Sequence, residues 1–510
     1  MPPLQPQQIR NIGVYGLIRE SSVDSSLKPE GAVSESVNFH FDRIGAATVR
    51  PGLTAFGGTV DVGEGFLALF NAGSSSLIAA TRGGGGEGIT VNKVPNVAGA
   101  LTWVGTAYGG ASQSGIVTEH KARFVDFAGY TLFIPVVHAG TFTSVTSSLQ
   151  YGQYPFNPVI SGGNPLNTDK FMDGSGATDR KSAKFGEVYK SRLYLAGDHT
   201  DRSRLFFSTV ITSAGNINWS PTIDYVDINP GDGENITGLK RFLNELLVFK
   251  PNYTYRFRTS GLDPDPMIRV GTRSQESIIE GKRGLYFHHD TGFYRYAGGV
   301  RAEEISRPIA DIVDAIPFGQ RDDIVAWKDS DHIYWSLAGN VTVDDPKGSV
   351  TFSNCVARYT ESSDVWTIYS YGFQVGAGAP FVTGTTSSIV IGLNNGVAAE
   401  PRGTTDVGQP IGYRLSTKWY EWEGIETKKT IQEMCAVAEK GMGIIVSYQT
   451  DDYEDWKSLS PDLRKLTTYF IKPTKKFNRI RFRVSGVSQH ESGVFLGIEI
   501  YKGINEGVIR

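Results

Sequence analysis

The sequence predicts an all-β protein, with a body of about six to eight hairpin units arranged as the blades of a β-propeller and a β-sandwich at the C-terminal end. Glycine accounts for 60 of the 510 residues, well above the usual share of ~7% and typical of a chain with many turns. The 23 Tyr and 27 Phe, against only 5 Met, favour strands over helices. Short strand–turn–strand units also recur along the chain, which is the third observation behind this fold class.

The first part of the chain is expected to lead into the body. Residues 1–30 begin with a polar stretch rich in Pro and Gln, so we expect an arm with little structure of its own. Two short strands follow, one on each side of a turn at 42–45, and the second ends at the Pro51-Gly52 turn. We assign residues 31–408 to the propeller body.

From about residue 65 the hairpin unit returns every 40 to 70 residues or so, near the ~40–50 residues of a four-stranded blade. The paired segments are 65–70 with 77–80, 123–127 with 130–134, 192–196 with 204–208, 246–249 with 253–257, 284–287 with 293–296, 332–335 with 355–359 and 365–369, and 388–391 with 397–398. A lone hairpin cannot bury its apolar face in water, so these units need a shared core. Radial packing around an axis supplies one. A stacked array of β-sandwiches stays as the alternative, because the chain carries no WD or kelch signature.

Two segments interrupt the recurrence. Residues 144–181 are rich in Ser, Gly, Asn and Pro and are expected to form a long inserted loop. Residues 302–316 carry apolar side chains at positions 305, 309, 312, 313 and 316. This spacing predicts a short helix on the β scaffold.

After about residue 408 the pattern changes to longer alternating strands, at 411–420, 443–448, 479–484 and 494–501. Alternation of this kind predicts a separate β-sandwich over residues 409–510. Lys472, Lys476, Arg479, Arg481 and Arg483 make this end of the chain locally basic.

Composition restricts the function. The net charge is −3, which argues against a dominant basic surface that grips nucleic acid but leaves room for a surface past which DNA slides. No run of about 18 apolar residues is present, so we expect no membrane span, and the first thirty residues lack the pattern of a secretory signal. Cys355 and Cys435 are expected to be buried, reduced thiols.

A search for catalytic chemistry is negative: no nucleophile elbow, zinc motif, phosphate loop or kinase motif is present. We therefore predict no catalytic residue, cofactor or metal, and a protein that is not an enzyme. The adjacent His288 and His289 would point to opposite faces of a strand. The acidic segment Asp224–Glu234 contains enough oxygen ligands for calcium, but a connector between strands is the preferred interpretation. The run Gly83–Gly86 has no following helix and is expected to be a hairpin tip.

Several short segments of the sequence together resemble a known family. They are Asn38–Asp42, Gly45, Arg50-Pro51-Gly52, Tyr189–Leu195, Phe206–Ser208, Trp219, Asp224–Asp227, and Ile236–Leu239 leading to Glu245–Lys250. This set is similar to the β-propeller nozzle proteins of short-tailed bacteriophages, also called tail tubular protein B, and to packaged-DNA stabilisation (plug or hub) proteins. The resemblance covers about residues 30–260, and the final sandwich more loosely. Asn38, Arg50, Pro51 and Gly52 are its most compact motif.

The resemblance implies a structural protein of the virion tail, assembled in the host cytoplasm as a ring, usually of six copies. Its implied partners are other copies of itself, the head-to-tail adaptor, tail fibre, spike or needle proteins, and the duplex DNA that passes through the channel. Such a ring retains packaged DNA and gates its release. Within the inserted loop we select Tyr151, Tyr154, Phe156 and Asn157 as candidate gate or contact residues. Two alternatives stay open: a propeller that binds or degrades glycans, and a distal tail hub that never contacts DNA.

Overall fold

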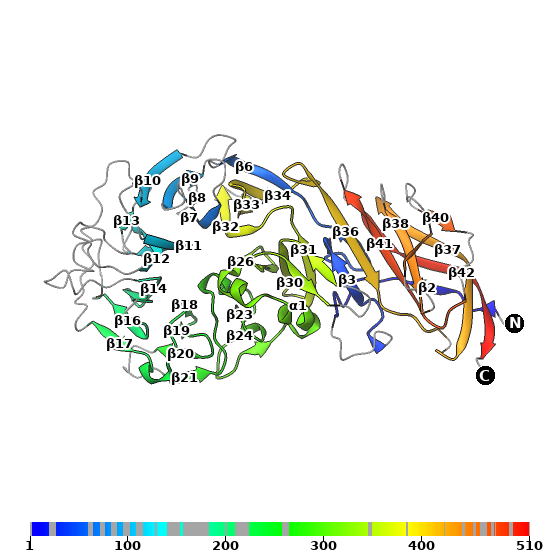
Figure 1. Ribbon diagram of the computed structural model, residues 1–510, viewed down its shortest axis with the longest axis horizontal. Coiled ribbons are helices and arrows are strands. Elements are labelled where there is room, and N and C mark those ends of the chain that lie inside the picture. Colours follow the sequence, from blue (N-terminus) through cyan, green and yellow to red (C-terminus); the bar gives the residue numbers. More distant parts are fainter. Residues whose placement is uncertain are drawn as a thin grey trace.

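The computed structural model describes most of the 510-residue chain. The described residues are 3–19, 27–59, 65–71, 77–82, 89–94, 102–108, 116–127, 130–139, 154–156, 183–198, 201–208, 210, 224–257, 265–344, 349–383, 386–422, 424–440, 444–451, 455–459, 467–470, 474, 476–488 and 493–508. Regular structure in this part of the chain is almost entirely β, as the sequence predicts, and its sheets form a ring of blades joined to a sandwich (Figure 1).

In the described part of the chain, seven antiparallel blades make up the ring: blades 1 to 5 are separate sheets, and blades 6 and 7 are parts of one larger sheet that continues into the sandwich. Blade 1 contains β7 (Phe66–Asn71), β8 (Leu77–Arg82), β9 (Ile89–Val94) and β10 (Thr102–Tyr108). Blade 2 contains β11 (Ile116–Phe127), β12 (Tyr130–Ala139) and β13 (Tyr154–Phe156). Blade 3 contains β14 (Phe185–Tyr189), β15 (Arg192–Ala196), β16 (Arg204–Phe207) and β17 (Tyr225–Asp227). Blade 4 contains β18 (Gly238–Phe242), β19 (Glu245–Phe249), β20 (Thr254–Phe257) and β21 (Asp265–Ile268).

The remaining blades lie nearer the sandwich. Blade 5 contains β22 (Ile279–Glu280), β23 (Leu285–His289), β24 (Gly292–Tyr296) and β25 (Glu303–Glu304). Blade 6 contains β26 (Val325–Lys328), β27 (His332–Ser336), β30 (Cys355–Thr360) and β31 (Val365–Ser370). Blade 7 contains β32 (Val375–Thr383), β33 (Thr386–Leu393), β34 (Val397–Pro401) and β6 (Leu53–Thr59). The expected hairpins are confirmed in every blade by the strand pairings.

The ring closes in blade 7. Strand β6 comes from the N-terminal part of the chain and pairs with β34, for example Thr54 with Glu400. The next strand along the chain, β7, contacts β32, the first strand of the same blade. Blade 7 is thus completed by a strand that precedes blade 1 in the sequence.

The C-terminal sandwich has two sheets. One holds β36 (Gln409–Thr417), β41 (Ile480–Ser488), β38 (Ile445–Thr450) and β39 (Lys457–Ser458); the other holds β37 (Thr427–Lys440), β42 (Val494–Val508) and β40 (Thr467–Phe470). Alternation along β41 buries Ile480, Phe482 and Val484 and turns the residues between them outward. This alternation places the sandwich core between its two sheets.

The N-terminal residues also contribute to the sandwich. Strands β1 (Pro3–Leu4) and β2 (Gln7–Ile9), which lie in the expected arm, pair with β42. Strands β4 (Phe39–His40) and β5 (Ala47–Val49) join the same sheet. Strand β3 (Val33–Val37) pairs with β36 and, at Val37, with β31 of blade 6, so it links the sandwich to the propeller.

The expected helix within 302–316 is confirmed but shorter. Helix α1 (Ala310–Asp314) follows a 3-10 turn, η5 (Arg307–Ile309), and buries Ile312 and Val313. The first part of the segment is strand β25, because Glu303 and Glu304 pair with β24. The other small elements are η3 (Pro230–Asp232), η4 (Gln275–Ser277), η6 (Phe318–Asp323), β28 (Val341–Val343), β29 (Val350–Phe352) and β35 (Thr405–Asp406).

One apolar core runs from the sandwich into blades 5 and 6. It includes Phe482 and Ile498 in the sandwich, Trp335 and Trp366 in blade 6, and Phe293 in blade 5. The two Trp rings stack at 5.7 Å, and both side chains are fully buried. Because this core is shared, the propeller and the sandwich are packed as one body.

Candidate functional site

The motif that carries the family resemblance forms a buried joint between the propeller and the sandwich. Asn38 lies between β3 and β4 with φ of +62°, a backbone conformation that Asn tolerates better than most residues. Its side-chain oxygen accepts hydrogen bonds from Arg50 Nε at 2.7 Å and from the Ser370 N–H of blade 6 at 2.8 Å. Its amide donates to the Gly412 carbonyl of β36 at 2.6 Å.

Arg50 occupies the centre of this joint. Its guanidinium is fully buried and meets Asp406 through two bonds, Nη1 to Oδ1 at 2.8 Å and Nη2 to Oδ2 at 2.5 Å. It also donates to the carbonyls of Pro51 and Ser370 and lies 4.2 Å from the centre of the Tyr371 ring. A bidentate pair with its remaining donors satisfied is the geometry in which a buried charge is stable.

Glycine is required at position 52 because another segment of the same chain, at Thr405, approaches its backbone closely. A Cβ atom at this position would lie 2.3 Å from the Thr405 carbonyl oxygen. The backbone of Gly52 also exchanges hydrogen bonds with Arg402 and Gly403 at 2.8 Å. Asn38, Arg50, Pro51 and Gly52 therefore lie together, as parts of one structural joint.

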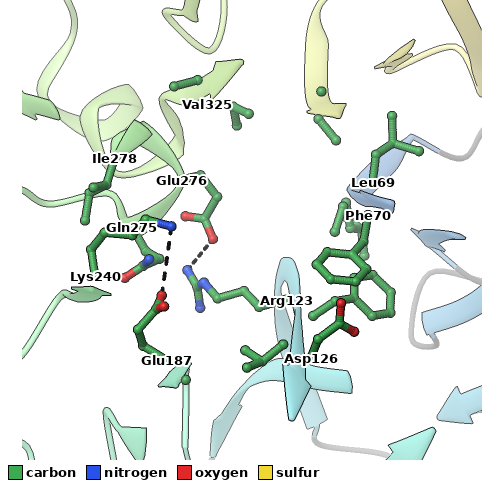
Figure 2. A pocket seen from close by; sticks show the side chains of 18 of the residues that line it. Leu69, Phe70, Arg123, Asp126, Glu187, Lys240, Gln275, Glu276, Ile278 and Val325 are labelled. Atoms are coloured by element: carbon green, nitrogen blue, oxygen red, sulfur yellow. Dashed lines mark ion pairs between the residues drawn. The ribbon is translucent and has the colours of Figure 1, made fainter. Parts of the chain in front are cut away.

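The second candidate region is a cavity of about 560 Å³ on the propeller axis, lined by the first strands of the blades. Its charged lining residues are Arg123, Asp126, Glu187, Lys240, Arg241 and Glu276. The two signs are balanced within this set, so the cavity lining is close to neutral overall. Apolar residues such as Leu69 and Phe70 cover the side formed by β7 (Figure 2).

An ion pair bridges the cavity between blade 2 and the segment that leads into blade 5. Arg123 of β11 places Nη2 2.5 Å from Glu276 Oε1 in η4, and Figure 2 shows the two side chains pointing toward one another. Burial alone would raise the pKa of Glu276, but the charges of Arg123 and Lys121 outweigh it and hold the pKa below its ordinary value. Arg123 Nε has no hydrogen-bond partner in the described part of the chain. The pair that bridges the cavity is thus not fully satisfied.

Glu187 has a weaker counter-charge in the same cavity. Its carboxylate lies 4.0 Å from Lys240 Nζ, at the outer limit of an ion pair. Burial raises the pKa of Glu187 above its ordinary value, with Lys240 and Arg241 opposing this effect. Two carboxyl groups with opposite pKa shifts therefore share one cavity, which is the arrangement that acid–base pairs use.

The acidic segment Asp224–Glu234 forms an ion pair with a lysine side chain of the same protein, Lys250. Lys250 Nζ is buried and lies 2.7 Å from both carboxylate oxygens of Asp232, and 3.1 Å from the Asn229 carbonyl. Tyr255 donates a further hydrogen bond to Asp232 at 2.9 Å. This segment is a connector whose acid is neutralised by an internal lysine, in agreement with the preferred interpretation.

Of the candidate gate residues, Tyr154 and Phe156 lie in β13, which pairs with β12 at Phe133 and Thr131. Tyr151 and Asn157 lie outside the described residues, as does the glycine run 83–86. The gate role of all four stays a prediction. Cys355 and Cys435 are buried thiols, as expected.

His288 and His289 are both buried in β23, and burial lowers the pKa of His288 to about 3. In the described part of the chain, no three His, Cys, Asp or Glu side chains gather in a way that would hold a metal ion. None of its helices is long and apolar enough to cross a membrane.

Sequence reasoning missed the partners of the joint and of the cavity. Asp406 stands in a turn-like Thr-Asp-Val-Gly stretch, with no local signal for a buried ion pair. Arg123 and Glu276 likewise stand in ordinary strand and connector sequence. The one available signal was the general preference of Arg for bidentate contacts with carboxylates, which indicates that Arg50 and Arg123 need an acidic partner but not which one.

Comparisons with known proteins identify no family. No family model matches the chain, and no curated protein matches it. Solved structures that resemble it include the extracellular domain of BT4673 from B. thetaiotaomicron, with a TM-score of 0.36, 9% identity and coverage of 68% of this chain and 39% of that one. The Neurospora crassa Pan2 WD40 domain has a TM-score of 0.39 and 8% identity, covering 69% and 95%. The AfRom2 CNH domain has a TM-score of 0.34 and 8% identity, covering 69% and 98%.

Proposed function

We propose that the protein is a structural subunit of the tail of a short-tailed bacteriophage, in which a ring of copies continues the DNA channel, retains packaged DNA and gates its release. The observation that carries the proposal is the position of the family-like motif. Asn38, Arg50, Pro51 and Gly52 join the propeller to the sandwich through buried bonds. A motif used in this way suits a rigid building block.

In this proposal DNA passes between copies and not along the propeller axis. The Arg123–Glu276 pair bridges the axis, and the axial cavity has a volume of only about 560 Å³. One turn of duplex DNA is about 34 Å long, with a major groove alone about 12 Å wide, and it does not fit such a space. A conduit would therefore need a ring of subunits, which forms through head-to-tail interfaces that close by rotation.

The near-neutral charge of the chain supports this role, because a conduit that bound phosphates tightly would hinder DNA movement. The head-to-tail adaptor on one side and fibre, spike or needle proteins on the other are the proposed neighbours. The proposed location is the virion tail.

Imaging of the purified chain, alone and with its adaptor, tests the proposal. We expect rings, with six copies as the predicted number, around an opening wide enough for duplex DNA. Arg50→Ala should reduce ring formation, because it uncouples the two parts of each subunit, whereas Arg402→Ala on the exposed surface should not. Absence of rings under both conditions would contradict the proposal. Deletion of residues 148–178 tests the gate separately: normal DNA retention would remove the gate role.

A second candidate function is glycan hydrolysis in the axial cavity, because Glu187 and Glu276 both line it, burial raises the pKa of Glu187, and the charge of Arg123 holds the pKa of Glu276 below its ordinary value. In that reaction Glu187 would be the general acid toward the leaving oxygen, and Glu276 would be the base that activates water or the nucleophile that attacks the sugar carbon. A panel of bacterial surface polysaccharides tests this function. Turnover that is lost in Glu187→Gln supports hydrolysis, and no turnover by the unmodified protein excludes it for that panel.

A further inference from the structure

Next to the Arg50 joint, the segment between β4 and β5 is fastened to blade 6 by a group of ionisable side chains. Asp42, which follows β4, accepts hydrogen bonds from Arg358 Nη2 of β30 at 2.7 and 2.8 Å. The Arg358 side chain is almost completely buried. Asp42 also lies 3.4 Å from His332 Nε2 of β27 and 3.4 Å from His40 Nδ1 of β4.

His332 lies between two carboxylates from different parts of the chain. Its Nδ1 is 2.7 Å from Asp329 Oδ1, in the turn between β26 and β27, and its Nε2 faces Asp42. Tyr334 donates to Asp329 at 2.9 Å and keeps that carboxylate in place. Only the protonated ring carries an N–H on both nitrogens, so both contacts are favourable only in the imidazolium form.

The charges around His332 favour its protonated form. The acidic groups are Asp42, Asp329 and Asp331; the basic groups are Arg358 and His40; and Tyr334 completes the set. Burial alone would lower the pKa of His332, but hydrogen bonds to Asp329 and Asp42 raise it above the ordinary value. Burial lowers the pKa of His40 to about 4, so His40 is neutral near pH 7 and does not compete for Asp42 as a cation.

We propose that His332 is a pH-operated latch that holds the segment between β4 and β5 against blade 6. In the protonated state the ring bridges Asp329 and Asp42, and the latch is closed. When the pH rises, Nε2 loses its proton while Nδ1–H keeps the shorter bond to Asp329. The lone pair on Nε2 then faces a carboxylate, and the contact with Asp42 is lost. The latch is thus fully closed below about pH 6.5, the ordinary His value, and opens as the pH passes the raised value.

The effect of opening is local, because the two ends of the segment are fixed independently. Asn38 and Arg50 stay in the joint through their bonds to one another and to Asp406. The part that loosens carries Arg43 and Ile44, whose side chains are largely exposed. The region therefore has two permanent fastenings, Arg50 with Asp406 and Arg358 with Asp42, and one titratable contact, His332 with Asp42. Loss of the titratable contact weakens the hold on Asp42 without releasing it.

Limited trypsin digestion of the full chain tests the latch, since Arg43 lies in the segment that loosens. Cleavage after Arg43 is measured relative to cleavage after Arg402, which is 74% exposed in its side chain and corrects for the pH dependence of trypsin. Between about pH 6.5 and 9 we expect this ratio to rise roughly fivefold, the size of one charge-assisted contact at a half-exposed site. A ratio that does not change with pH would overturn the proposal.

Three variants assign the effect to His332. His332→Gln should give the high ratio at both pH values, whereas the matched control His40→Gln should keep the rise of the unmodified protein. Asp329→Asn leaves the ring in place but removes one carboxylate, so the rise should move to lower pH. This variant decides the question if His332→Gln does not fold. A rise that persists in His332→Gln, or that moves to higher pH in Asp329→Asn, would reject the latch.

Discussion

The joint and the axial cavity both contain an arginine–carboxylate pair between distant parts of the chain, but the two pairs differ in how completely they are satisfied. Arg50 is fully buried and uses its donors on Asp406, Asn38 and two carbonyls. Arg123 is partly exposed, pairs with Glu276 through one nitrogen, and leaves Nε without a partner in the described part of the chain. The first arrangement satisfies every donor of its guanidinium, whereas the second leaves one buried donor unpaired.

This difference distinguishes ion pairs that mainly stabilise the fold from ion pairs that contribute less to it. A buried ion pair with all donors satisfied is destabilising to break but offers nothing to a ligand. A pair with a buried, unsatisfied donor stabilises the fold less, because that donor has lost its water without gaining a partner. The free energy of unfolding of variants at the two sites tests whether the two ion pairs differ in this way.

The largest expected effect is that of Arg50→Ala. Removing the guanidinium leaves the Asp406 carboxylate buried without a partner, so we expect the free energy of unfolding to fall by roughly 3–5 kcal/mol. Urea denaturation measures this loss. Arg402→Ala is the matched control: its exposed pair with Glu400, at 3.4 Å, should contribute no more than about 1 kcal/mol. Equal losses in the two variants would contradict the structural role of the joint.

Gly52→Ala is expected to have the next largest effect. The added methyl group would lie 2.3 Å from the Thr405 carbonyl oxygen, so the backbone must shift, at a cost of roughly 1–3 kcal/mol. Gly412→Ala is the control, since a Cβ there meets no atom within 4 Å. Thermal unfolding of both variants decides whether the close approach at Gly52 is required.

A smaller effect is expected for Glu276→Gln in the axial cavity. The loss should be about 1–2 kcal/mol near pH 7, because Arg123 keeps its bond to the Lys184 carbonyl. The pKa of Glu276 is lowered in the folded chain, so its contribution is present above the ordinary Glu value and disappears as the pH falls through the lowered one. Unfolding measured between about pH 7 and 3 should show the two proteins converging in acid. A loss that does not depend on pH would show that the ion pair is not its cause.

The smallest effect is expected for Lys240→Gln. At 4.0 Å from Glu187, this ammonium should contribute less than about 0.5 kcal/mol. Its removal should nevertheless raise the pKa of Glu187 further, because Lys240 is the first of the charges that lower it. Infrared or NMR titration of that carboxyl measures the shift. A pKa of Glu187 that falls in the variant would contradict this assignment.

Local pattern was enough to predict most of the propeller. The hairpins at β15 and β16 or at β23 and β24 were visible because alternating strands and their turns are close in sequence. The helix was predicted too long because Glu303 and Glu304 pair with β24, a tertiary contact that helical spacing does not reveal. Strands β1 and β2 were missed because segments of two and three residues carry no periodic signal.

The sites were less predictable, for a physical reason. The joint connects Arg50 with Asp406, 356 residues away, and Asp42 beside it bonds to Arg358, 316 residues away. Only the closed ring brings these partners together. The family-like motif marked one half of the joint, Asn38 and Arg50, but nothing in the local sequence indicated the other half.

Because β6 closes the ring by pairing with β34, blade 7 can be completed only late in the synthesis of the chain. Thr54 of β6 cannot pair with Glu400 of β34 until Glu400 has been synthesised, and blade 7 is incomplete until then. At 5–20 residues per second, a ribosome needs roughly 20–70 seconds to span that interval. During this time the edge of β6 lacks its partner β34 and can pair with a neighbouring nascent chain. The propeller is therefore complete only when nearly the whole chain has been translated, and a chain that ended before β34 would leave blade 7 open.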